Sequence, residues 1–72
     1  MKPWERLKQI RETQNRSEEE IAEVLGSSVK QIQLWESGAR NMPTHHYITL
    51  ARVYHLSLDY VVGLIDEEGE LE

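Results

Sequence analysis

Residues 17–38 read SEEEIAEVLGSSVKQIQLWESG, and this stretch decides the fold. It holds two short apolar patterns of helical spacing, each preceded by a serine, Ser17 or Ser28, and followed by a glycine. A serine hydroxyl can accept hydrogen bonds from the free amides at a helix start, and a Glu or Gln stands three residues after each serine. Gly26 suits the end of the first helix. The stretch therefore predicts two helices that are joined by a tight turn and cross steeply.

Helical patterns also flank this stretch on both sides. Residues 3–14 carry an apolar residue every three positions, and residues 44–55 carry a second apolar face after the loop 37–43. A fifth helix is expected to begin at Ser57 and to run through Ile65. Strand-like alternation is missing from the sequence. The sequence predicts an all-α fold, a compact five-helix bundle.

Length and charge narrow the class of protein further. The 72 residues are 39% apolar and include no cysteine, which favours a single small domain and argues against most enzymes. Five of the 13 acidic residues fall in residues 66–72, so residues 1–65 carry no net charge although the whole chain carries −5. We expect a folded domain over residues 1–65, an acidic disordered tail over residues 66–72, and a cytoplasmic, nucleoid-associated protein without a membrane segment.

Residues 17–26, together with Ile32, Trp35-Glu36, Gly38 and Arg40, resemble the Cro and phage-repressor (XRE-like) helix-turn-helix family. The resemblance extends from about Leu7 to Leu64. It implies a bundle of the lambda-repressor-like DNA-binding type, in which the second helix of the motif lies in the major groove of double-stranded DNA. It also implies a sequence-specific transcriptional regulator of bacterial or phage type, with no cofactor.

The resemblance places DNA contacts on a defined set of side chains. Lys30 can donate to guanine, Gln33 can pair with adenine, and the outward Val29 and Leu34 can meet thymine methyl groups. The full set expected at the DNA is Ser17, Ser28, Val29, Lys30, Gln31, Gln33, Leu34, Arg40 and Asn41. Arg11 and Glu36 match a pair that bridges the first and third helices in the family.

Three positions depart from the family pattern. Glu18 stands where a glutamine usually contacts phosphate, and a carboxylate there would repel the DNA backbone. Arg16 replaces a usual leucine, and Ser27 a usual valine. The cations expected to reach phosphates are Arg16, Lys30 and Arg40, with Arg11 and Lys8 as further candidates. Because so few cations reach the DNA phosphates, we expect two copies of the chain to bind together.

The last helix is apolar nearly all round, which predicts a homodimer interface formed by Tyr60, Val61, Leu64 and Ile65. Two alternatives remain open: an adaptor that uses the same fold to bind a protein partner, and an antitoxin-like module. His45, His46 and His55 lack the spacing of a helical zinc site, so no metal is expected. Neither a phosphate-binding loop nor a catalytic arrangement is present in the sequence, which argues against an enzyme.

Overall fold

The first helix, α1 (Pro3–Thr13), begins at a proline whose fixed backbone angle already suits the first helical position. The computed structural model, which describes residues 2–62, places a Glu5 carboxylate oxygen 3.0 Å from the Lys2 amide nitrogen, and this bond closes the helix start. Helix α1 ends just before Gln14, and Asn15 then takes up a left-handed conformation with φ of 57°. Asparagine adopts this conformation more readily than most residues that carry a Cβ atom.

The central stretch folds into α2 (Glu18–Leu25) and α3 (Val29–Glu36). Ser17 and Ser28 cap these helices, and each hydroxyl oxygen accepts from the backbone amide three residues on, at 3.0 and 3.2 Å. Gly26 follows α2 with φ of 65°, a left-handed conformation that glycine adopts without steric cost. The predicted pair of capped helices with a tight turn is confirmed.

Two further helices complete the described part of the chain. Helix α4 (Thr44–Tyr54) ends at His55, which is left-handed with φ of 57°. Ser57 then caps α5 (Leu58–Val61) and accepts from the amide three residues on at 3.2 Å. The last helix was expected to run through Ile65, but α5 ends at Val61 and Val62 lies in a turn. Residues 63–65 and the expected acidic tail lie outside the described residues.

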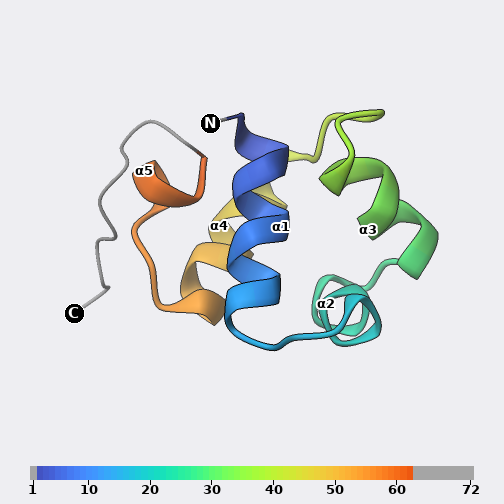
Figure 1. Cartoon of the computed structure of the whole chain (residues 1–72), viewed down its shortest axis with the longest axis horizontal. Coiled ribbons are helices and arrows are strands. Elements are labelled where there is room, and N and C mark those ends of the chain that lie inside the picture. Colours follow the sequence, from blue (N-terminus) through green and yellow to red (C-terminus); the bar gives the residue numbers. More distant parts are fainter. Residues whose placement is uncertain (1, 63–72) are drawn as a thin grey trace.

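Helix α1 runs through the centre of the molecule, with α2 and α3 on one side and α5 on the other (Figure 1). It contacts both α3 and α5, while α2 packs on α3 and α4 packs on α5. The buried apolar residues come from all five helices and the loops near α4: Leu7, Ile10, Ile21, Ala22, Ile32, Trp35, Met42, Leu50, Ala51, Tyr54, Leu56, Tyr60 and Val61. The predicted all-α five-helix fold is confirmed. One side of α3 is left free of core contacts.

No helix among residues 2–62 is both long and apolar enough to cross a lipid bilayer.

Candidate nucleic-acid interface

Helix α3 has one side in the core and one side facing outward. Ile32 and Trp35 are buried, at 1% and 8% exposure, whereas Lys30 and Gln33 are exposed. Leu34 is half-buried. Because residues 33 and 34 follow residue 30 by three and four positions, all three side chains lie toward the same face of the helix. Three of the four side chains predicted to meet base edges, Lys30, Gln33 and Leu34, therefore lie on this outward face.

The N-terminal turn of α3 agrees less fully with that assignment. Ser28 is exposed, but its hydroxyl oxygen is occupied in capping the Gln31 amide. Val29 was expected to point outward, yet it is half-buried and packs against the core. Gln31 is also half-buried. Among the residues of α3 that were predicted to contact DNA, Lys30 and Gln33 therefore have exposed polar side chains.

The turn between α2 and α3 is closed by main-chain bonds and small residues. The Ser27 amide donates to the Ala22 carbonyl at 2.8 Å, and the Gly26 amide donates to the Glu23 carbonyl at 3.2 Å. Ala22 is buried at 5% exposure, and its small side chain allows α2 and α3 to pack closely. In Figure 1, α2 is seen nearly end-on while α3 runs across the view, so the two helices cross steeply. Because of this crossing, α3 lies at the edge of the molecule with one side exposed to solvent (Figure 1).

A buried ion pair fixes the far end of α3. Arg11 Nε lies 2.9 Å from Glu36 Oε2, and Arg11 Nη2 donates to Glu36 Oε1 at 3.0 Å. The two side chains are 11% and 7% exposed. The hydrogen bond to Glu36 is the main reason that the pKa of Arg11 is raised above its ordinary value. The helix-bridging pair expected from the resemblance is present, and its guanidinium is committed to the scaffold.

Arg16 is held inside the structure, although it was expected to reach a phosphate. Its guanidinium donates to Glu20 Oε2 at 2.7 Å, to Gln14 Oε1 at 3.1 Å and to the Val53 carbonyl at 3.4 Å. It also lies 5.8 Å from the centroid of the Tyr54 ring. These contacts join the α1–α2 link to the end of α4. Arg16 therefore has a structural role, and the expected phosphate contact stays a prediction.

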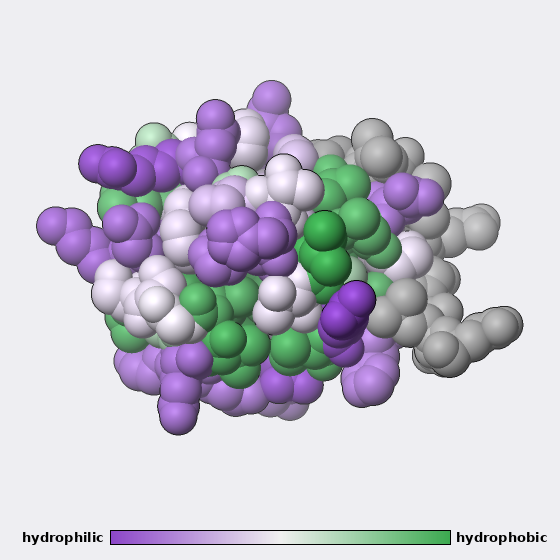
Figure 2. All heavy atoms as spheres, turned by 180° about the vertical axis from the view of Figure 1, so that it is seen from behind, coloured by the Kyte–Doolittle hydropathy of each residue, from purple (hydrophilic) through white to green (hydrophobic). Residues whose placement is uncertain are grey.

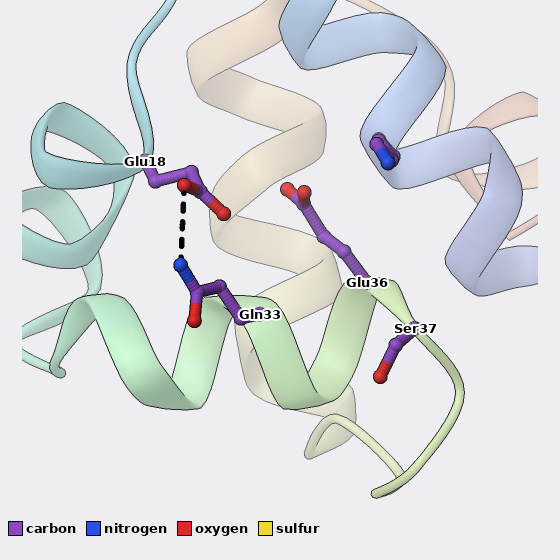
Figure 3. Close-up of a pocket in the computed structure, with 5 residues that line it drawn as sticks. Glu18, Gln33, Glu36 and Ser37 are labelled. Atoms are coloured by element: carbon purple, nitrogen blue, oxygen red, sulfur yellow. Dashed lines mark hydrogen bonds between the residues drawn. The ribbon is translucent and has the colours of Figure 1, made fainter.

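A small open pocket of about 150 Å³ lies where α1, α2 and α3 meet, and it is lined by Lys8, Glu18, Gln33, Glu36 and Ser37. Figure 3 shows the Glu18 side chain reaching from α2 toward the Gln33 side chain on α3. Gln33 Nε2 donates to Glu18 Oε1 at 3.4 Å. The carboxylate that replaces the family's usual glutamine therefore contacts a residue of the outward face.

The loop that follows α3 carries the remaining expected contacts. Arg40 and Asn41 are exposed, while the next residue, Met42, is buried at 8% exposure and anchors the loop. The Arg40 amide donates to the Leu34 carbonyl at 3.2 Å, which holds the loop against the end of α3. Both side chains are thus exposed on a loop that is bonded to the C-terminal part of α3.

His46 contacts α3 from the first turn of α4. Its ring centroid lies 5.2 Å from that of Trp35 and 4.2 Å from that of His45. Burial lowers the pKa of His46, and the neighbouring His45 lowers it further. No group of three or more His, Cys, Asp or Glu side chains suited to a metal ion occurs among residues 2–62.

The expected dimer interface is corrected at two of its four positions. Val61 is 0% exposed and Tyr60 is 8% exposed, so both belong to the core of the chain itself. The guanidinium of Arg6 lies 4.0 Å from the centroid of the Tyr60 ring, which ties α5 to α1. Leu64 and Ile65, the other two positions, lie outside the described residues.

Two buried features had no clear signal in the sequence. Arg6 is 3% exposed and donates from Nη1 to the Tyr60 carbonyl at 3.4 Å, but arginine on an amphipathic helix usually indicates a solvated side. Gly38 has φ of 82° and lies so close to Trp4 that an added Cβ would be 2.7 Å from the indole Cε2. A glycine just after a helix predicts the turn, but it does not predict which side chain covers it.

The fold and the capped, outward-facing α3 define a helix-turn-helix protein of the Cro and phage-repressor type. The Helix-turn-helix family matches residues 7–61, and this chain belongs to it. It is 32% identical over 63 residues to the uncharacterized HTH-type transcriptional regulator YobD of Bacillus subtilis (strain 168). That match covers 88% of this chain and 56% of the relative, so the chain spans little more than half of the relative's length. No solved structure gives a significant match.

Proposed function

We propose that the protein is a sequence-specific transcriptional regulator that binds double-stranded DNA with α3 in the major groove. The observation that carries this proposal is the division of α3 into two sides. Ile32 and Trp35 anchor the helix in the core, while Lys30 and Gln33 are exposed on the other side. Their groups suit base edges, since a lysine ammonium donates to guanine O6 or N7 and a glutamine amide pairs with adenine N6 and N7.

Orientation on the duplex comes from contacts that carry no sequence information. Arg40 and Asn41 are exposed next to α3, where they are available to the phosphates that flank the groove. Ser17 and Ser28, at the starts of α2 and α3, are exposed on their helix ends as well. Main-chain amides at these helix ends attract phosphate oxygens.

The protein acts as a homodimer in this proposal, because a single copy offers few cations to the phosphates. Arg11 and Arg16 are occupied within the scaffold, which leaves Lys30, Arg40 and Lys8 exposed. Each neutralised phosphate adds only about 0.9 to the salt slope of binding, so two copies are needed for firm binding at physiological salt. Figure 2 shows apolar surface on the side of the molecule where α4 lies. Exposed apolar side chains on α4 and α5, Ile48 and Leu58, are available to a partner copy.

Selection from a pool of random duplexes at two salt concentrations tests this function. Light scattering on the same sample measures the number of chains. A dimer predicts an inverted repeat whose half-sites lie about 10 bp apart, or a multiple of that spacing, and which is still enriched at the higher salt. Failure to enrich any sequence at low salt would refute the DNA-binding function.

The second candidate is an adaptor that binds a protein through the same fold. Its support is the acidic first turn of α2, where Glu18, Glu19 and Glu20 follow one another at the helix end that would approach the DNA backbone. These carboxylates repel phosphates and suit a basic protein surface. A stoichiometric partner that stays bound after nuclease treatment, together with no enrichment of DNA, would favour the adaptor.

A further inference from the structure

Glu18 and Gln33 come from different helices and are brought together by the packing of α2 on α3. Glu18 is the first residue of α2, directly after the Ser17 cap, and Gln33 is in the middle of α3. Gln33 Nε2 donates to Glu18 Oε1 at 3.4 Å, and Figure 3 shows the amide oxygen of Gln33 pointing away from Glu18. The bond is long and exposed to solvent, so its effect concerns the orientation of the amide rather than the stability of the fold.

The charge of Glu18 decides which way this amide turns. An ionised carboxylate can only accept hydrogen bonds, so it attracts the amide NH₂ of Gln33 and repels the amide oxygen. A glutamine at position 18 could bond the Gln33 amide in either orientation, because it has both a donor and an acceptor. The carboxylate therefore selects one of two orientations that are otherwise nearly equal in energy.

The selected orientation favours one kind of base edge. One N–H of Gln33 is directed to Glu18, which leaves the amide oxygen and the second N–H for a base. Adenine offers a donor at N6 and an acceptor at N7, and that pattern fits one oxygen and one N–H. Guanine offers acceptors at both O6 and N7, so it would need two N–H groups and would also meet the negative charge of Glu18.

We propose that Glu18 is a positioning residue that makes Gln33 select adenine and reject guanine at its base pair. This inference rests on the proposed DNA-binding function. In this inference Glu18 has two effects: it repels the phosphates of the DNA backbone, and it increases the specificity for one purine. The residue thus exchanges some affinity for discrimination between the two purines.

The test compares Glu18→Gln with the control variant Glu19→Gln. Both substitutions remove one negative charge from the first turn of α2, but it is Glu18 that accepts the hydrogen bond from Gln33. Dissociation constants are measured for the selected duplex and for a duplex with guanine in place of adenine at the base pair that Gln33→Ala identifies. For the unaltered protein we expect adenine to be preferred by about tenfold or more.

We expect Glu18→Gln to bind both duplexes more tightly and to reduce the preference for adenine by about fivefold or more. Glu19→Gln should tighten binding to both duplexes and leave the preference unchanged. The contact itself is followed without DNA, through the NMR signals of the Gln33 side-chain amide, which should move in Glu18→Gln and stay in place in Glu19→Gln.

The outcomes separate this inference from the proposed function. If the unaltered protein enriches an operator and Glu18→Gln keeps its purine preference, the positioning role is refuted and the DNA-binding function stands. If Glu19→Gln lowers the preference as much as Glu18→Gln does, charge alone is responsible and the positioning role is also refuted. If no duplex is bound by the unaltered protein, both proposals fail together.

Discussion

Arg11 and Glu36 join the middle of the molecule to the last turn of α3 through a two-pronged ion pair, with Nε 2.9 Å from Oε2 and Nη2 3.0 Å from Oε1. Arg11 Nη1 also donates to the Arg16 carbonyl at 3.1 Å, so one side chain holds α1, the α1–α2 link and α3. The orientation of the outward face relative to the rest of the chain depends on this side chain.

We expect Glu36→Leu or Arg11→Met alone to lower the free energy of unfolding by about 3–5 kcal/mol, because each leaves the partner charge buried without its counter-ion. A domain of this size rarely has more than about 3–5 kcal/mol of stability, so either single variant should be largely unfolded. The double variant should be more stable than either single one. Tryptophan fluorescence in urea shows whether the double variant stays folded at higher urea concentrations than either single variant, and a double variant less stable than both would contradict the expectation.

Gly38→Ala should destabilise the protein more than Gly26→Ala. Both glycines have positive φ, 82° and 65°, which costs about 1–2 kcal/mol for alanine. An added Cβ meets nothing within 4 Å at Gly26, but at Gly38 it would lie 2.7 Å from Trp4 Cε2. The difference in melting temperature between the two variants measures the Trp4 contact. Replacing Trp4 by alanine as well should remove most of that difference, and an equal melting temperature for the two glycine variants would be the contrary result.

Gln33→Ala and Arg40→Ala should weaken DNA binding in different ways. Loss of the Gln33 amide should cost about 1–3 kcal/mol on the selected site and relax the preference at one base pair. Loss of Arg40 should weaken binding to all sequences alike and reduce the salt slope by about 0.9 for each phosphate that is no longer neutralised. Binding isotherms on selected and scrambled duplexes at several salt concentrations distinguish the two. Parallel losses on both duplexes for Gln33→Ala would argue against base reading by that residue.

The stability should fall as the pH is lowered from 7.5 to 5.5, in part because of His46. Burial lowers the pKa of His46 in the folded chain below its ordinary value of 6.5. The unfolded chain therefore binds more protons in this range, and the free energy of unfolding decreases until the pH is below the folded pKa. His46→Asn should flatten the pH dependence of the melting temperature. A melting temperature that depends on pH as strongly in His46→Asn as in the unaltered protein would contradict this expectation.

The helix starts could be predicted because they are local. Ser17, Ser28 and Ser57 each cap a helix with a hydroxyl three residues from its amide partner, and such spacing is visible in one short stretch of sequence. The family resemblance supplied the Arg11–Glu36 pair, whose members are 25 positions apart. The outward positions 30 and 33 follow from helical spacing once the buried residues of α3 are known.

The failures concern contacts between distant segments. Tyr60 and Val61 were assigned to a dimer surface because an all-apolar helix does not reveal which side its own chain covers, and here α1 covers it. The bond from Arg16 to the Val53 carbonyl was not predicted, because the two residues are 37 positions apart along the chain. Val29 was assigned to the outward face, but its side chain packs against the core. Position in the first turn of a helix does not determine which side chains the rest of the chain covers.

The side chains at positions 30 and 34 take no part in the buried core, although they share a two-turn helix with Ile32 and Trp35. In the proposed DNA-binding function, recognition and folding are thus carried by different residues of the same segment. A library randomised at these two positions should keep its melting temperature while its members prefer different duplexes. If the library behaves in this way, the buried core stays the same while exchange of a few surface side chains on α3 changes the DNA sequence that is preferred.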